Sequence, residues 1–466
     1  MKQENMLQHP EFIGDIGLGR ADITPSAGIF CKLWGASTHY VASGVHKPLF
    51  ASCVLFRNKE SNLDLYMITA DLSWWRNSAE ERIIRTEILR RCQLKENQLI
   101  IHLSHSHSAP STSLYNLTQP GGELIPLFRD KVLDGFEKAI KEAQRTCKNS
   151  CLTWATGKCQ LACNRDQAIK TDSGTTTVVG LNPNDDADDT LLVGRIVDAE
   201  NNIRAVLVNY ACHPVSLGSG NSKISPDYVG RMREVVEAEL KVNSKEGICL
   251  FFHGASGELT PRISYSSHTQ DADNNGLEIG YAVLSTLASM LPAQKALAFD
   301  RIEQSGAPLG RWALKESSAS LKLSVAKAEV ELSYLDLPKL QEIDQLIKQT
   351  EEGFTLERLK RRRMLREDMG DGNSRVISFP IWQVGNAIFV ALNAEAYSHF
   401  QVSLRKRFPN IAVICMNIAN GYLSYLPTKE AYDLPDLYPA KVAVFEKGCL
   451  EKTIDVSVAT IERLIK

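Results

Sequence analysis

The sequence carries no excess of charge of either sign. Lys and Arg total 53 and Asp and Glu total 55, which gives a formal net charge of −2 over 466 residues. It also has no apolar run of about 18 residues, the length that crosses a membrane, and its first residues, Met1 to Met6, include no apolar signal core. We therefore expect no nucleic-acid partner, no binding to a membrane surface and no membrane span.

Regular cysteine spacing is missing as well. The eleven cysteines are odd in number and form no framework, which predicts reduced, buried thiols and a cytoplasmic location. The pairs Cys147/Cys151 and Cys159/Cys163 have no matching second pair, so a cysteine metal clip is the less favoured interpretation. Internal repeats and low-complexity linkers are also absent. Residues 1–466 are therefore predicted to form one large unit.

Apolar runs alternate with segments of helical periodicity along the chain. The runs have the β-branched, turn-bounded composition of buried strands, and the segments between them carry apolar residues at helical spacing. Strands are predicted at residues 49–56, 65–70, 98–103, 205–212, 249–252, 321–332, 376–384, 387–392 and 411–416, and helices at 79–92, 126–147 and 276–291, with another starting near 226–227. This order predicts an α/β fold built on a large mixed sheet.

Two stretches depart from this order. Residues 291–310 are predicted to be rich in turns, and residues 337–367 form a long charged helical segment, interpreted as an insertion with a break near Gly353. The one basic cluster, Lys360 to Arg363, lies in this glutamate-rich helical segment and is predicted to be a solvated helix face.

Polar ligand types stand where several predicted strands end. His105 and His107 follow the strand at 98–103, and in extended backbone residues two apart point to the same side, so both can face one cleft. His213 follows the strand at 205–212, and Glu395 follows the one at 387–392. Strand ends that converge would place these side chains around one metal ion. The alternative for the His105/His107 pair, two histidines in a polar turn, is about equally favoured on these residues alone.

Asp71 ends the strand at 65–70. It is a candidate partner for a metal-bound histidine, and a helix N-cap or a turn is an equally good interpretation.

A series of motifs spanning nearly the whole chain carries a family resemblance. In order they are Gly19 to Thr24, Gly44-Val45-His46, Asp71-Leu72, Ser104 to Pro110, Asn164-Arg165, His213-Pro214, Gly257 to Pro261, Glu395, and Asn420 to Tyr425 with Thr428. Their order and spacing resemble the catalytic domain of the neutral/alkaline, non-lysosomal ceramidases, which are zinc amidases that split ceramide into sphingosine and a fatty acid.

The resemblance implies a set of site residues. Zn²⁺ would be held by His105, His213, Glu395 and Tyr425, with Tyr422 as the alternative to Tyr425. His107 would act beside the metal as a proton carrier or oxyanion partner. Arg165 would bind a polar part of the substrate, with a structural ion pair as the less favoured alternative. Nitrogen and oxygen ligands with one open position suit a catalytic zinc, which lowers the pKa of its water to about 7.

Two residues depart from the family pattern. Thr260 stands where the family has a catalytic serine, and Arg262 replaces an amide side chain. Threonine keeps the hydroxyl, so Thr260 is retained as a catalytic candidate. Arg262 adds a positive charge that suits a polar or anionic substrate, with a structural ion pair as the alternative at even odds. The C-terminal sandwich domain of the larger ceramidases has no counterpart in residues 1–466.

The function expected from the resemblance is hydrolysis of an amide (N-acyl) bond by metal-activated water, on a small-molecule or lipid-like substrate. One alternative is a zinc hydrolase of a small polar or sugar-derived ester or amide, and another is a metal-stabilised binding protein without turnover. A soluble polar substrate is expected to be cleaved better than long-chain ceramide. The sequence indicates no oligomeric state.

Overall fold

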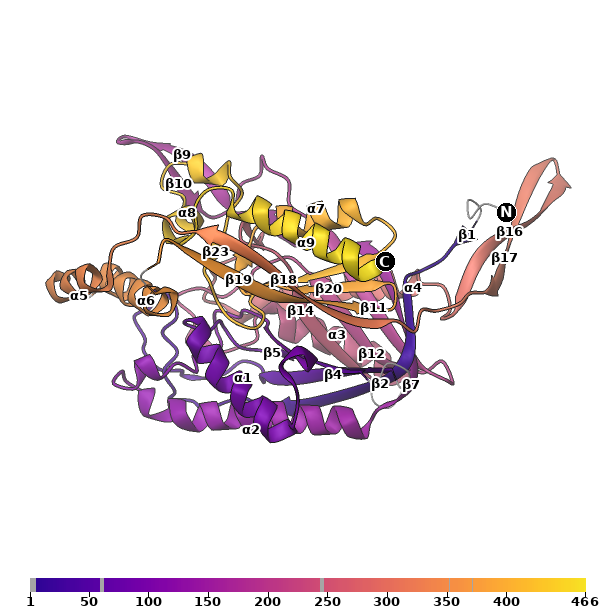
Figure 1. The fold of residues 1–466 in the computed structure, drawn as a ribbon, viewed down its shortest axis with the longest axis horizontal. Coiled ribbons are helices and arrows are strands. Elements are labelled where there is room, and N and C mark those ends of the chain that lie inside the picture. The colour runs from indigo at the N-terminus through magenta and orange to yellow at the C-terminus, as the bar shows by residue number, and fades with distance from the viewer. Residues whose placement is uncertain (1–5, 59–62, 244–246, 352, 371) are drawn as a thin grey trace.

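Two β-sheets packed face to face, with helices on both outer faces, form the framework of the protein (Figure 1). The structure, a computed structural model, describes residues 6–58, 63–243, 247–351, 353–370 and 372–466. In spatial order the eight-stranded sheet consists of β14 (Ile248–His253), β12 (Ile203–Tyr210), β11 (Thr190–Asp198), β7 (Lys148–Lys158), β2 (Glu11–Asp22), β4 (Phe50–Asn58), β5 (Leu63–Ala70) and β6 (Leu99–Leu103). The four-stranded sheet consists of β18 (Leu323–Ser333), β19 (Ser374–Val384), β20 (Ala387–Ala391) and β22 (Ala412–Met416).

Both sheets are mixed, as predicted. The pairs β12/β14, β5/β6 and β20/β22 are parallel, and the other neighbours in the two sheets are antiparallel. The predicted strands at 49–56, 65–70, 98–103, 205–212, 249–252, 321–332, 376–384, 387–392 and 411–416 correspond to β4, β5, β6, β12, β14, β18, β19, β20 and β22. The prediction of an α/β fold with a large mixed sheet is confirmed.

The unbroken apolar run of β4 reflects burial on both faces. Cys53 and Leu55 pack toward helices α1 (Ser78–Cys92) and α2 (Ile125–Arg145), whereas Val54 and Phe56 face the core between the sheets. In that core the ring of Phe389 on β20 contacts the ring of Phe56, with centroids 6.0 Å apart. Apolar side chains that alternate between two buried faces therefore fix β4 in the middle of the molecule.

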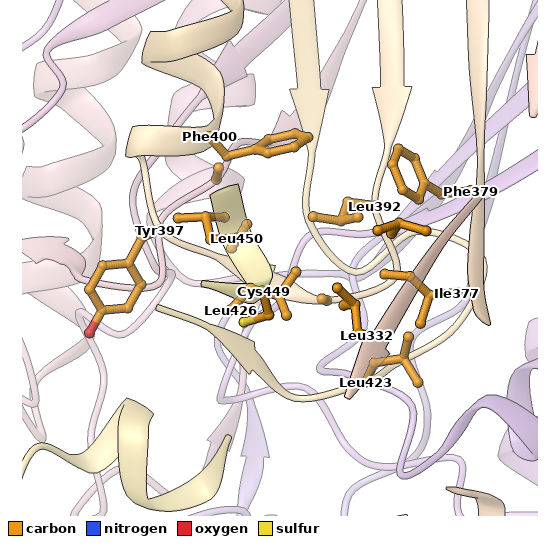
Figure 2. Packing of buried hydrophobic residues seen from close by; sticks show 14 of the residues in the cluster. Leu332, Ile377, Phe379, Leu392, Tyr397, Phe400, Leu423, Leu426, Cys449 and Leu450 are labelled. Carbon is orange, nitrogen blue, oxygen red and sulfur yellow. The ribbon is translucent and has the colours of Figure 1, made fainter. Parts of the chain in front are cut away.

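Further helices cover the remaining faces. Helices α3 (Tyr228–Asn243) and α4 (Thr269–Ala288) pack on β11, β12 and β14, and α7 (His399–Arg407) and α9 (Cys449–Ile465) cover the outer face of the smaller sheet. Figure 2 shows this last core, where Phe400 of α7 and Leu450 of α9 meet Phe379 and Leu392. None of the helices formed by the described residues combines the length and the apolar character needed to cross a membrane.

Short two-stranded pairings accompany the two main sheets. They are β3 (Gly44–Val45) with β13 (Lys223–Ile224), β8 (Ala162–Asn164) with β15 (Leu259–Pro261), β9 (Asp166–Thr171) with β10 (Gly174–Val179), and β21 (Glu395–Ala396) with β23 (Tyr425–Leu426). The last of these is parallel and places Glu395 directly opposite Tyr425.

The prediction of a turn-rich stretch at residues 291–310 is wrong. The chain forms a long hairpin there, β16 (Lys295–Ser305) and β17 (Ala307–Glu316), joined to β1 (Met6–Leu7). Gly306 makes the turn with φ +72°, a left-handed conformation that suits glycine. In Figure 1 the hairpin projects from the end opposite to α5 and α6. Most of its side chains face solvent, so they lack the buried alternation that reveals a strand in the sequence.

The helical segment predicted at 337–367 corresponds to α5 (Leu340–Gln349) and α6 (Phe354–Met369), with Gly353 at the start of α6. The interpretation of this segment as an insertion in one catalytic unit covering residues 1–466 stays a prediction. Helix α8 (Tyr438–Val442) lies between β23 and α9. All eleven cysteines are free thiols.

The larger sheet curves until its two edges meet. The backbone N–H of His253, at the end of β14, donates to Nε2 of His102 on β6, 3.1 Å away. The hydroxyl of Thr69 on β5 donates to the carbonyl of Phe251 on β14. Strands at opposite ends of the sheet order are thereby held together, and the segments that follow β6 and β12 open into the same space.

Candidate metal centre

His105 and His213 meet beside this closure of the sheet. His105 follows β6 and His213 follows β12, and both are almost completely buried, with ring centroids 4.9 Å apart. His105 has φ +67°, a conformation that costs a non-glycine residue roughly 1–3 kcal/mol. In this conformation the His105 ring reaches the backbone carbonyl of Ser73.

Each of the two imidazoles is oriented by a backbone carbonyl. Nδ1 of His105 lies 3.0 Å from the carbonyl oxygen of Ser73, and Nδ1 of His213 lies 2.7 Å from that of Ser256. A carbonyl oxygen only accepts, so Nδ1 carries the proton in both rings and Nε2 presents its lone pair. A histidine that binds a metal through one ring nitrogen usually donates the other N–H to an acceptor of this kind.

The carboxylate of Glu395 lies where both lone pairs point. Its Oε2 is 3.0 Å from Nε2 of His213 and 3.3 Å from Nε2 of His105. Burial favours the neutral form of a carboxyl, but the charge and hydrogen bonds that His105 and His213 supply when protonated outweigh it and hold the pKa of Glu395 well below its usual range. Burial, followed by the charge of Arg165, lowers the pKa of His213 to about 3. A neutral imidazole and an ionised carboxylate are the protonation states that bind a metal.

Two tyrosines border Glu395. The hydroxyl of Tyr422 donates to Oε1 of Glu395 at 2.9 Å, and Tyr425 sits opposite Glu395 in the β21/β23 pair. Burial and the nearby carboxylate raise the pKa of both phenols well above the usual value. Both side chains therefore reach the centre, and the choice of Tyr425 over Tyr422 as ligand stays a prediction.

His107 lies as close to the centre as the predicted ligands. Its Nε2 is 3.2 Å from Nε2 of His105, and the nitrogens of His105, His107 and His213 lie within 4.8 Å of one another. Two imidazole nitrogens at this separation require a proton or a cation between them. These three histidines form a group that can bind a metal ion. His107 was expected to act as a proton carrier beside the metal, and the distances also place it within ligand reach.

Arg165 brings a positive charge to the same point. It is buried, and its Nη2 donates to the carbonyl of Gly257 at 2.6 Å and to the hydroxyl of Tyr425 at 3.2 Å. The same nitrogen is 3.4 Å from Nε2 of His213. The predicted site residues Arg165, His213 and Tyr425 therefore lie together.

A cavity of about 340 Å³ opens onto this cluster. Its floor carries His105, His107, Arg165, Glu395, Tyr422 and Tyr425. Around them stand aromatic, apolar and basic side chains, among them Trp34, Trp74, Tyr265, Tyr438, Met364, Leu365, Arg76, Arg358, Arg361 and Arg362. The cluster therefore faces a hollow of a size suited to a small organic ligand.

A family model described as neutral/alkaline non-lysosomal ceramidase, N-terminal, matches residues 15–280, more than half of the sequence. The chain belongs to this ceramidase family. The matched segment contains His105, His107, Arg165, His213 and Thr260, whereas Glu395 and Tyr425 lie beyond it. The resemblance inferred from the motifs is confirmed.

Curated relatives and solved structures carry the same family name. The neutral ceramidases of Drosophila melanogaster and Drosophila pseudoobscura pseudoobscura are 26% and 24% identical over 271 and 264 residues. Each match covers 53% of this chain and 36% of the relative, so the chain matches little more than a third of these proteins.

The fold of the chain is also that of solved ceramidases. The neutral ceramidase from Pseudomonas aeruginosa aligns over 98% of this chain and 75% of its own, with a TM-score of 0.65 and 17% identity. A ceramidase complexed with C2 aligns over 98% of this chain and 76% of its own, with a TM-score of 0.63 and 17% identity.

Thr260, which the resemblance places at the position of a catalytic serine, follows Leu259, whose carbonyl accepts the backbone N–H of His213. It lies in β15, is fully buried, and its hydroxyl forms no hydrogen bond with any described residue. Within the described part of the chain, Thr260 is not one of the residues that line the cavity. A catalytic role for Thr260 stays a prediction.

Two charged residues singled out in the sequence serve structural contacts. Arg262 forms an ion pair with Glu278 at 2.6 Å, with its side chain 47% exposed, and does not line the described cavity. Arg262 was interpreted either as a substrate-binding residue or as part of a structural ion pair, and the structure shows the ion pair. Asp71 accepts two hydrogen bonds from the guanidinium of Arg233 and one from the backbone of Phe50. The suggestion that Asp71 orients a metal-bound histidine is wrong, since the backbone carbonyls of Ser73 and Ser256 orient His105 and His213.

The arginines of α6 that line the cavity were not predicted from the sequence as part of the site. The prediction that Lys360 to Arg363 form a solvated face is wrong for Arg361 and Arg362, which line the cavity. Ser73 and Ser256 act through backbone carbonyls, which leave no trace in a sequence. Trp74 and Arg76 lie one and three residues after Ser73, in the segment that follows β5.

Proposed function

We propose that the chain is a zinc-dependent hydrolase that cleaves an amide (N-acyl) bond, as the family name suggests. The single observation that carries the proposal is the convergence of Nε2 of His105 and His213 on Oε2 of Glu395, within 3.3 Å, while each Nδ1 is fixed by a carbonyl. Side chains that are already oriented in this way suit a resident metal better than a purely structural hydrogen-bond network.

The donor set fits zinc. Two neutral imidazoles, one carboxylate and a phenol offer nitrogen and oxygen atoms, which zinc accepts in catalytic sites that keep an open position. His105, His213 and Glu395 would hold the ion, together with Tyr425. A zinc ion bound there would polarise the amide carbonyl and activate water.

The neighbouring residues have distinct tasks in this proposal. His107, whose Nε2 lies 3.2 Å from Nε2 of His105, would take a proton from water and pass it to the leaving nitrogen. Burial lowers the pKa of His107 well below its usual value, which keeps the free imidazole unprotonated. Arg165, fixed by the carbonyl of Gly257, directs its charge to the place where negative charge develops on the acyl oxygen. The ring centroids of Trp34 and Trp74 lie 5.0 and 4.8 Å from that of His107, and all three side chains line the cavity.

Metal content and activity test the proposal together. The unmodified protein, purified without chelators, is expected to contain about one zinc per chain by elemental analysis. It should also release fatty acid from an N-acyl substrate. His105→Ala, His213→Ala and Glu395→Gln should lose both properties, whereas His268→Ala, a change of an exposed histidine at the start of α4, should keep both.

The two readouts separate the alternatives. Stoichiometric zinc with no turnover of any N-acyl or ester substrate would support the metal-stabilised binding protein instead. Absence of any transition metal would refute the zinc site itself. A protein that cleaves esters but no amides would favour the ester hydrolase.

A further inference from the structure

One wall of the cavity is strongly basic and is made by two segments far apart in the sequence. Arg76 follows β5, and Arg358 lies on α6 three and four residues before Arg361 and Arg362, a spacing that brings side chains to one side of a helix. Glu357 and Glu395 are the acidic residues of the described cavity lining, and Glu395 is already engaged by two histidines. Arginines therefore outnumber carboxylates in the described cavity lining.

Arg76 is the member of this wall that is buried without a hydrogen-bond partner for its Nη1 among the described residues. Its Cζ lies 4.4 Å from the ring of Trp74. Burial, with the neighbouring Arg361, lowers its pKa to about 10. The carboxylate of Glu80 accepts the backbone N–H of Arg76 and the hydroxyl of Thr112. A buried guanidinium without a partner is costly unless a ligand completes it.

The arginines on α6 are differently engaged. Arg361 donates to the carbonyl of Leu33 at 2.6 Å, with its Cζ 5.8 Å from the Trp74 ring. Arg358 and Arg362 form no ion pair with any residue that the structure describes. Arg363, on the same helix but outside the cavity, pairs with Asp344 at 2.6 Å. Arg358 and Arg362 thus lack an ion-pair partner among the described residues, whereas Arg361 and Arg366, which also line the cavity, are held by backbone carbonyls.

The wall adjoins the candidate metal centre. The indole of Trp74 contacts Arg76 and also His107 and His105, at ring centroid distances of 4.8 and 5.6 Å. One aromatic ring thus separates the unpartnered guanidinium from the histidines. An anion held by the wall would lie a few bonds away from an acyl group at the metal.

We propose that the basic wall binds an oxyanion carried by the amine part of the substrate, so that the chain acts on N-acyl amines bearing a carboxylate or sulfonate. Guanidinium forks match such groups with paired, charge-assisted hydrogen bonds. The cavity volume, near the low end for small-molecule pockets, also suits one acyl chain and a compact head.

The proposal rests on the hydrolase function for its chemistry. Water adds its oxygen to the acyl carbon, the C–N bond breaks, and the nitrogen leaves with a proton. The products are a carboxylic acid and an amine that still carries the anionic group, and no electrons are exchanged.

Matched substrates test the preference. N-octanoylglycine and N-octanoyltaurine carry an anion where N-octanoylethanolamine has a hydroxyl group. The unmodified protein should cleave at least one of the anionic substrates with a kcat/KM about 10-fold or more above that of the ethanolamide. The double variant Arg358→Gln/Arg362→Gln should lose this preference, because its KM should rise more for the anionic substrates than for the ethanolamide.

A control variant of Arg363 on α6 and a variant of the buried Arg76 extend the test. Arg363→Gln should retain the preference because Arg363 faces away from the cavity, and Arg76→Met, which keeps the side-chain volume, should lose it. If Arg76→Met fails to fold, the double variant on α6 decides alone. Equal kcat/KM for the anionic and neutral substrates, or equal losses for both in the double variant, would overturn the proposal.

Binding without turnover separates this proposal from the hydrolase function. N-(octylsulfonyl)glycine and N-(octylsulfonyl)ethanolamine replace the amide by a sulfonamide that is not hydrolysed. Calorimetric titration should show about 10-fold tighter binding of the glycine compound, lost in Arg358→Gln/Arg362→Gln. Such binding by a protein that cleaves no amide would refute the hydrolase and retain the anion site. Equal affinities in an active enzyme would refute only the anion site.

Discussion

At the scale of single residues, the strained backbone of His105 predicts an unusual order of stability. Its φ of +67° penalises any side chain with a Cβ, whereas glycine adopts it freely. With metal removed by a chelator, His105→Gly should be more stable than His105→Ala by about 1 kcal/mol. Urea unfolding followed by circular dichroism measures the difference.

His213 provides the matched control, because its backbone φ is not positive. There the glycine variant should be no more stable than the alanine variant, since glycine gains nothing from that conformation and loses more chain entropy on folding. An alanine variant at His105 that equals or exceeds the glycine variant in stability would contradict the inferred strain.

Replacing the buried Glu81 on α1 by glutamine is expected to raise the free energy of unfolding, by an amount that depends on pH. Its side chain is 3% exposed, and burial raises its pKa to about 7. The native state then binds more protons than the unfolded state between pH ~4.5 and ~7, so stability falls as pH rises through this window. Glu81→Gln should be more stable than the unmodified protein by about 3 kcal/mol at pH ~8 and equal to it at pH ~4.

Thermal or urea unfolding at both pH values checks this prediction. The glutamine is tolerated because Arg85 keeps its hydrogen bonds to Asn420, Glu96 and Leu99. Glu239→Gln, a change of an exposed glutamate on α3, is the control and should alter stability little at either pH. A Glu81→Gln variant whose advantage does not grow from acidic to basic pH would count against a buried, unfavourable charge.

The residues of the candidate site differ in how far the sequence revealed them. His105, His213 and Glu395 were found because polar ligand types stand out at the ends of apolar strands. Arg76 was missed because nothing in Trp74-Trp75-Arg76 tells a buried guanidinium from an exposed one. Its burial depends on α6, which follows almost three hundred residues later.

At the scale of elements, Asn209 joins the two sheets. It is fully buried on β12, and its Nδ2 donates to the carbonyls of Phe252 on β14 and Cys415 on β22, at 2.9 Å each. Its Oδ1 accepts from Arg405 of α7 at 3.0 Å. Asn209→Ala should lower the free energy of unfolding by about 3 kcal/mol, because three buried groups lose their partner.

Denaturant unfolding measures the free energy of unfolding of Asn209→Ala, and Asn202→Ala provides a control from the same region of the chain. Asn202 is exposed just before β12, and its replacement should change stability by less than about 0.5 kcal/mol. Similar effects of the two substitutions would mean that Asn209 contributes no bridge between the sheets.

Elements were predictable where both faces of a strand are buried. β4, β12 and β20 are unbroken apolar runs since helices cover one face and the opposing sheet covers the other. The hairpin β16/β17 was missed because its side chains mostly face solvent, and the basic face of α6 was misread because a cavity-facing arginine has the same sequence signature as a solvated one.

At the scale of the whole molecule, the candidate centre depends on the curvature of the larger sheet. β6 and β14 are at opposite ends of its strand order, yet His253 and His102 join them by a hydrogen bond. Apolar periodicity gives no information on such closure, so the sequence predicted ligand types without showing how they meet. The family resemblance supplied that missing step through the order of motifs.

The same architecture predicts that zinc stabilises the entire fold. His105 and His213 extend from the larger sheet, whereas Glu395 and Tyr425 lie in β21 and β23, which accompany the smaller sheet. An ion bound by all four would join both halves and bind only the native state. At a free zinc concentration about 1,000-fold above the dissociation constant, it would add about 4 kcal/mol to the free energy of unfolding, or about 4 °C in Tm for a chain of this size.

Scanning calorimetry of chelator-treated protein, before and after zinc is restored, measures this shift. His105→Ala should show no response to zinc, and His268→Ala should respond like the unmodified protein, because His268 is exposed and distant from the four proposed ligands in the sequence. The zinc-free protein should retain its secondary structure, since the cores between and outside the sheets contain no metal ligand except Tyr425. A Tm that is unchanged by zinc in the unmodified protein would mean that the four side chains do not bind the ion jointly, and the convergence of strand ends would then be a hydrogen-bonded arrangement without a metal.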